Sequence, residues 1–108
     1  MANAFKRYTA VGVTSETTIF TCPTSPTTTS ILIGLLIANV HASAQADVTA
    51  QVVTTGAAAD PKIISEVPVP KSSSLEVMEG KIVMEAGDVL KVTSTQTVDV
   101  TLSVLEQT

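Results

Sequence analysis

The sequence predicts an all-β fold, an antiparallel β-sandwich of jelly-roll-like type with eight to nine short strands. Thr, Val and Ile, whose β-branched side chains favour strands, number 17, 15 and 7 among 108 residues. Short apolar runs alternate with turn-forming residues, and no segment keeps a helical period over about ten residues. A chain of this length corresponds to one domain. We therefore expect residues 1–108 to form a single sandwich with a short N-terminal arm of about residues 1–5.

The N-terminal half is expected to contain four strands, at residues 5–13, 17–22, 31–40 and 46–54. Pro23 ends the second strand. The polar loop that follows contains Pro26, which cannot donate to a ladder, and hydroxyl side chains that favour local turns. In the fourth strand Val48, Ala50 and Val52 alternate with polar residues, which is typical of a half-buried strand. Residues 55–61 form a flexible connection with room for a short helical turn.

The C-terminal half is expected to contain five strands, at residues 62–69, 75–78, 81–85, 88–94 and 98–106. Prolines at 61, 68 and 70 enclose the first of these strands and indicate a sheet edge. Gly80 and Gly87 supply the positive φ that tight turns need. From Val98 onward the last strand alternates between apolar and polar residues, which is typical of an antiparallel strand with one solvent-exposed face.

The strand at 31–40 is apolar on both sides. Strict alternation puts Ile31, Ile33, Leu35 and Ile37 on one face and Leu32, Leu36 and Ala38 on the other. A sandwich has one interior, so the second face is covered either by a loop of the same chain or by another copy. We expect a homo-oligomer, preferably a trimer or dimer. Its predicted self-association residues are Ile31, Ile33, Leu35, Leu36 and Ile37.

Charge and hydropathy exclude several partners. The formal net charge is −4 and the isoelectric point about 4.7, without the clustered basic face of a nucleic-acid-binding protein. The apolar run from Ile31 to Ala38 is too short for a membrane-spanning helix, which needs about 20 residues. No apolar segment follows Lys6 and Arg7, so we expect no signal peptide and folding in a cytoplasm.

Residues for catalysis or metal binding are scarce. The chain has one His and one Cys, so a zinc site, a Ser-His-Asp triad and a Cys-His pair lack partners. His41 is expected at a strand end on the surface, and Cys22 as a packed thiol. The acids are scattered and form no calcium loop, and no glycine-rich phosphate loop is present. We expect no enzyme, no cofactor and no metal.

The ends of the chain resemble a known group of proteins. The opening Ala2-Asn-Ala-Phe-Lys-Arg-Tyr-Thr-Ala-Val-Gly-Val13 is similar to the start of small virion structural proteins of tailed bacteriophages, particularly those of cyanobacteria. The segment from Val67 to Glu106, which includes Ala86-Gly-Asp-Val-Leu-Lys-Val92, shows the same resemblance. Residues 42–60 match less well.

The resemblance implies a non-enzymatic virion protein, made in the host cytoplasm. The preferred interpretation is a capsid cement (decoration) protein, which binds the outside of the head and bridges capsomers. A neck, tail or fibre component of the same particle is the alternative. A host-surface binding module is disfavoured, because only three aromatic residues are present and Trp is absent. The implied partner is the major capsid protein or another virion protein. The predicted contact residues are Phe5, Lys6, Arg7 and Tyr8, around the one adjacent basic pair.

Overall fold

The computed structural model describes residues 3–54, 61–78 and 80–108. Within these residues the chain forms nine β-strands and no helix, so the all-β prediction is confirmed. The strands are β1 (Asn3–Val13), β2 (Thr17–Thr21), β3 (Thr29–Asn39), β4 (Ala46–Val53), β5 (Lys62–Val69), β6 (Ser74–Glu76), β7 (Ile82–Met84), β8 (Val89–Ser94) and β9 (Val98–Gln107). The described part of the chain contains no helix that is long and apolar enough to cross a membrane.

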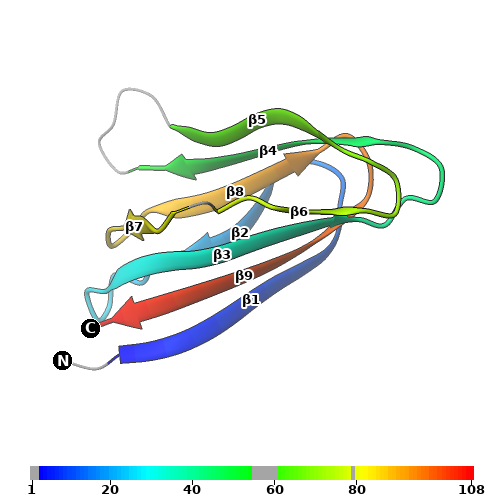
Figure 1. The fold of residues 1–108 in the computed structure, drawn as a ribbon. Helices are drawn as coiled ribbons and strands as arrows, with labels where there is room; N and C mark the ends of the chain where they lie inside the picture. Colours follow the sequence, from blue (N-terminus) through cyan, green and yellow to red (C-terminus); the bar gives the residue numbers. More distant parts are fainter. Residues whose placement is uncertain (1–2, 55–60, 79) are drawn as a thin grey trace.

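The strands form two antiparallel sheets that face each other. Sheet A has the order β1-β9-β3-β6, with β7 also pairing with β3, and sheet B has the order β2-β8-β4-β5. The pairing is nested, because β4 pairs with β5, β3 with β6 and β7, β2 with β8, and β1 with β9. A long hairpin wrapped into two layers in this way is a jelly roll. Figure 1 shows the two layers and the termini at one end of the molecule.

The core lies between the two sheets. β4 and β9 bury every second residue, which is the pattern that their alternating sequences predict. Val and Leu side chains of β8 and β9 supply about a third of this interior, and each contributes about 1.5–3 kcal/mol when fully buried. On the side where β1 and β2 lie, the rings of Tyr8 and Phe20 pack with centroids 4.7 Å apart. This side of the sandwich is therefore closed.

A β-bulge in β3 decides which of its residues face the core. The pairing of β3 with β9 shifts between Leu32 and Gly34, and Leu32, Leu35 and Ile37 are all fully buried. An extra residue in one strand reverses the alternation beyond it. The grouping that strict alternation predicts for this strand is therefore wrong. The residues that point away from the core are Ile31, Ile33, Leu36 and Ala38.

The strand boundaries agree with the predicted ones to within two residues. β1 already begins at Asn3, so residues 3–5 of the expected free arm belong to sheet A. Residues 55–60 of the expected connection lie outside the described residues, as do residues 1–2 of the arm. β5 is an edge strand of sheet B, as its prolines predict.

Candidate functional site: an apolar sheet face and an interlayer groove

The outer face of sheet A, the side turned away from sheet B, carries an apolar row across four strands. Phe5 of β1 pairs with Leu105 of β9, Leu105 pairs with Ile31 of β3, and Ile31 pairs with Val83 of β7. Residues directly opposite each other in a ladder share one face of the sheet. Four apolar side chains therefore lie in line on the outer side. We call the outer side of sheet A the apolar face.

The apolar face contains the exposed large hydrophobic side chains of the described residues. Within those residues they are Phe5, Val11, Ile33, Leu36, Val40 and Val83. Phe5 and Val11 alternate outward on β1, Ile33 and Leu36 on β3, and Val40 directly follows β3. Their gathering on one face distinguishes this surface from the scattered exposed apolar residues that are normal in monomers.

The outer face of sheet B is polar by contrast. Its outward residues on β2, β8 and β4, placed by their register with the buried ones, are Thr18, Lys91, Thr93, Asp47, Thr49 and Gln51, followed by one apolar pair, Val53 and Val89. Sheet A also carries polar residues on its outer side, namely Asp99, Thr101 and Ser103 of β9. The two outer faces therefore differ mainly along β3, whose outward residues Ile31, Ile33, Leu36 and Ala38 are apolar. The apolar face is therefore the candidate surface for binding another protein.

The structure places the five predicted self-association residues in two different environments. Leu35 and Ile37 are 0% exposed and belong to the core. Ile31, Ile33 and Leu36 lie on the apolar face, where Ile33 and Leu36 are each 39% exposed. The expected surface on this strand therefore consists of three of the five residues, and the bulge is the reason that the other two are excluded.

The four predicted contact residues on β1 also point to two sides. Phe5, which is 79% exposed, and Arg7 lie on the apolar face. Lys6 and Tyr8 point to the other side, where both reach Oε2 of the buried Glu106 at 3.1 Å. Arg7 forms no ion pair with the described residues. Phe5 and Arg7 are thus available for a partner, whereas the half-exposed Lys6 and the part-buried Tyr8 are bonded to Glu106.

Glu106 shifts the ionisation of both of its neighbours. Its hydrogen bond and its negative charge raise the pKa of Lys6 above 10.5. Burial, and then the hydrogen bond to Glu106, raises the pKa of Tyr8 above 10.0. The cluster joins β1 to β9 at the end of the molecule where the two termini lie. It acts as a structural connection of the edge strand.

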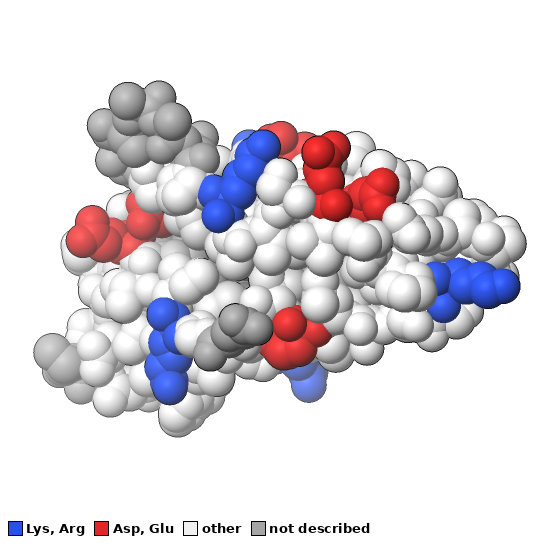
Figure 2. Space-filling view, turned by 45° about the horizontal axis from the view of Figure 1, so that its top comes forward, with Lys and Arg blue, Asp and Glu red and all other residues white. Residues whose placement is uncertain are grey.

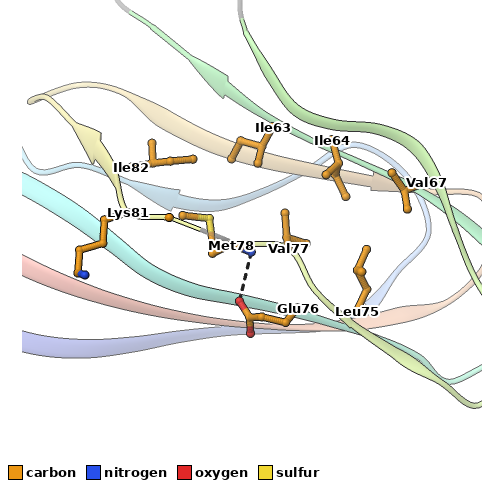
Figure 3. A pocket seen from close by; sticks show the side chains of 10 residues that line it. Ile63, Ile64, Val67, Leu75, Glu76, Val77, Met78, Lys81 and Ile82 are labelled. Atoms are coloured by element: carbon orange, nitrogen blue, oxygen red, sulfur yellow. Dashed lines mark hydrogen bonds between the residues drawn. The ribbon is translucent and has the colours of Figure 1, made fainter.

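A groove opens between the layers on the side opposite Tyr8 and Phe20. Its volume is about 490 Å³, and its lining residues are Ile63, Ile64, Val67, Leu75, Glu76, Val77, Met78, Gly80, Lys81 and Ile82. Figure 3 shows the aliphatic side chains of β5 facing those of the segment from β6 to β7, with Lys81 directed away from them. One side of the sandwich is therefore closed by aromatic packing and the other is open and aliphatic.

Glu76 connects this groove to the bulge of β3. Its Oε1 accepts hydrogen bonds from the backbone N–H of Leu35 at 2.9 Å and of Met78 at 3.3 Å. The backbone N–H of Val77 donates to the Leu35 carbonyl at 2.8 Å. The carboxylate thus satisfies a backbone donor just beyond the irregular part of the ladder.

Cys22 and His41 both have structural contacts. Cys22 is fully buried, as predicted for a packed thiol, and its Sγ lies 3.2 Å from the Thr28 carbonyl and from Ser30 Oγ. His41 follows the end of β3, where its Nδ1 accepts hydrogen bonds from the backbone N–H groups of Ser43 and Ala44. Among the described residues, no three His, Cys, Asp or Glu side chains gather in a way that could hold a metal ion.

The charged side chains of the described residues form no large patch on the face that Figure 2 shows. Figure 2 shows Lys and Arg as separate spots, interspersed with small groups of Asp and Glu on a mostly uncharged surface. The surface features that distinguish this protein are therefore apolar ones, the apolar face and the interlayer groove.

Sequence reasoning missed part of the apolar face. Leu105 interrupts the polar outward series Asp99, Thr101 and Ser103, and this break was a usable signal. The contribution of Val83 depends on the pairing of β7 with β3. The interlayer groove depends on the relative placement of two sheets, which no local pattern reports.

Comparisons with known proteins give the fold. No family model and no curated protein matches the chain. Among solved structures, a chain from the Bacillus endospore appendages that form disulfide-linked pili matches with a TM-score of 0.56 and 10% identity, over 97% of this chain and 84% of that chain. Eiger TNF from S. frugiperda matches with a TM-score of 0.38 and 12% identity, over 94% and 90%. The chain is thus similar in fold to a structural protein of a bacterial appendage.

Proposed function

We propose that this chain is a non-enzymatic structural protein of a virion, a capsid cement protein of a tailed phage that binds the outside of the head and bridges capsomers. The observation that carries the proposal is the apolar face, where the exposed large hydrophobic residues of the described chain gather on one sheet. A contiguous exposed apolar surface of this kind is typical of an interaction site. The similarity of the chain ends to small phage virion proteins supports the choice of particle.

The rigid sandwich suits this role. Both layers are held by nested antiparallel pairing, and the buried side chains of the described residues leave no polar atom without a hydrogen bond. A cement protein needs a stable body and surfaces for its neighbours on the shell. The body is the jelly roll, and Phe5 at its terminal end is the residue that we assign to contact with the capsid.

A subunit of an extended filament is a second candidate, because the structural neighbour with the TM-score of 0.56 belongs to a pilus. The cysteine chemistry favours the cement protein. That neighbour belongs to disulfide-linked pili, whereas the one Cys of this chain is fully buried and hydrogen-bonded. A disulfide between subunits would require Cys22 to leave the core.

Cryo-electron microscopy of the virion of the phage that encodes the chain tests the proposal. We expect one jelly-roll density per site on the outer surface of the head. Density at the neck, tail or fibres instead would assign the chain to the alternative location, and its absence from the particle would overturn the proposal. Negative-stain images of the purified protein that show long filaments would favour the second candidate.

A binding assay with heads that lack the protein tests the contact residues. Phe5→Asp should reduce co-sedimentation with heads by roughly 100-fold in affinity, because an exposed aromatic anchor is replaced by a charge. Thr18→Asp on the polar outer face of sheet B is the matched control and should bind as the unchanged protein does. Equal binding by both variants would exclude Phe5 from the contact.

A further inference from the structure

We propose that the central stripe of the apolar face is an interface with a second copy of the same chain, which makes a two-fold dimer with its sheets A packed outer side to outer side. The stripe consists of the outward residues of β3 and the residue after it, Ile31, Ile33, Leu36, Ala38 and Val40. The inference deepens the proposed function, because it names the partner that covers most of the apolar face.

The absence of charge on β3 favours a second copy as occupant. A residue near a two-fold axis meets its own counterpart, so a charged one would face a like charge. The described stretch from Thr29 to Val40 contains no charged residue. The charges of the apolar face lie to either side, Arg7 and Asp99 on β1 and β9 and Glu76 on β6. An aliphatic stripe with charges only at its flanks is self-complementary.

The two-fold operation also brings opposite charges together. An axis along β3 exchanges the two flanks, so the β9 and β1 flank of one copy lies over the β6 and β7 flank of the other. Arg7, which has no ion pair within the described residues, then comes near Glu76 of the second copy. In the apolar row, Leu105 of one copy lies over Val83 of the other. Both flanks therefore match in chemistry.

The available area lies near the minimum that a specific interface needs. β3 has 11 residues. At about 3.3 Å per residue and about 4.8 Å per strand, a face of three strands covers roughly 500 Å² in projection. Two copies thus bury roughly 1,000 Å² of projected area, without the additional area of the uneven side-chain surface. This value reaches the minimum expected of a specific interface.

The position of β3 in sheet A leaves β1 uncovered. Two strands, β9 and β1, lie on one side of β3, and only the short β6 and β7 lie on the other. In the dimer each β1 therefore extends beyond the edge of its partner. Phe5 and Val11, which are 79% and 82% exposed and are the most exposed large hydrophobic residues of the described part, remain free on both flanks. The dimer thus presents one uncovered flank from each copy for contact with other proteins.

Analytical ultracentrifugation of the full chain tests the dimer. We expect a dimer at micromolar concentration, and a Leu36→Asp variant that is monomeric, with its affinity for a second copy reduced by roughly 100-fold or more and an unchanged far-UV circular dichroism spectrum. Thr18→Asp should remain dimeric. A monomeric unchanged chain, or a dimer that survives Leu36→Asp, would overturn the inference.

Cysteine substitution gives a second readout that does not depend on folding energetics. Cys22 is fully buried, so an engineered surface cysteine is the accessible thiol of each variant. Leu36→Cys should form an intermolecular disulfide under mild oxidation in much higher yield than Thr18→Cys. Equal yields would contradict the inference.

The two proposals fail in different ways. Phe5→Asp should leave the dimer intact and weaken head binding, because Phe5 lies on the uncovered flank. If the unchanged chain is monomeric but binds heads through Phe5, the dimer is wrong and the cement function stands. If the chain is dimeric but no head binds it, the dimer stands and the cement function is wrong.

Discussion

Oε1 of Glu76 accepts a hydrogen bond from the backbone N–H of Leu35 at 2.9 Å, although 41 residues separate the two in the chain. The bond holds β6 against β3 just past the bulge, where the regular ladder is interrupted. The bulge in turn determines which side of β3 enters the core. A side chain on a three-residue edge strand thus supports the residue pattern of a central strand.

Replacing Glu76 should destabilise the sandwich. Glu76→Ala leaves two backbone N–H groups without their acceptor, and we expect the free energy of unfolding to fall by about 1–3 kcal/mol. Glu76→Gln keeps an acceptor oxygen and should lose less than Glu76→Ala. Urea unfolding measures both, with Glu85→Ala as the control on an exposed residue. Equal losses for Glu76→Ala and Glu85→Ala would show that the bond contributes nothing.

The bulge predicts unequal effects for two residues that strict alternation places on one face. Leu35→Ala removes a fully buried side chain and should cost about 2–5 kcal/mol. Ile33→Ala should cost less than about 1 kcal/mol, because Ile33 lies on the outer side. Both are measured in the Leu36→Asp background, so that association does not contribute. Similar losses at both positions would mean that β3 is regular.

Stability should fall at alkaline pH through Lys6 and Tyr8. Both pKa values are raised in the folded chain, above 10.5 for Lys6 and above 10.0 for Tyr8. The stabilisation is therefore fully present below the unfolded-state values and is lost as the pH rises through the folded-state ones. Tyr8→Phe should reduce the slope of unfolding free energy against pH in this window. An unchanged slope would mean that Tyr8 ionises equally in both states.

The thiol of Cys22 should be unreactive in the native protein. It is fully buried and lies against Thr28 and Ser30, so a thiol reagent reaches it only after opening of the core. We expect negligible modification in buffer and complete modification in urea. Fast modification of the folded chain would indicate local opening near β2.

The strands were predictable because their signals are local. Pro23 and Pro26 bound one loop, Gly87 has the positive φ of a turn, and β9 follows its alternating pattern over its whole length. These features depend on neighbours in sequence, and the predicted boundaries accordingly agree with the observed ones.

The residues of the surface were less predictable, because they depend on contacts between distant segments. Gly34 in the run from Ile31 to Ala38 is a residue that often marks a bulge, but the acceptor that supports this bulge, Glu76, belongs to another strand. Likewise, Lys6 and Tyr8 point to the inner side of β1, where both bond to Glu106, a residue near the other end of the described chain. An apolar strand could be recognised from sequence, but not the side on which it presents its side chains.

The nested strand order also has a consequence for how the protein folds. β1 pairs with β9, and Asn3 lies opposite Gln107, so the edge strand finds its partner only after the intervening chain has been made. Contacts of such large sequence separation form slowly, because loop closure must precede them. During synthesis β1 therefore stays unpaired, with Phe5 and Val11 exposed, until β9 has been made. The hairpin of β4 and β5 at the centre of the nest, which closes locally, is where we expect folding to begin.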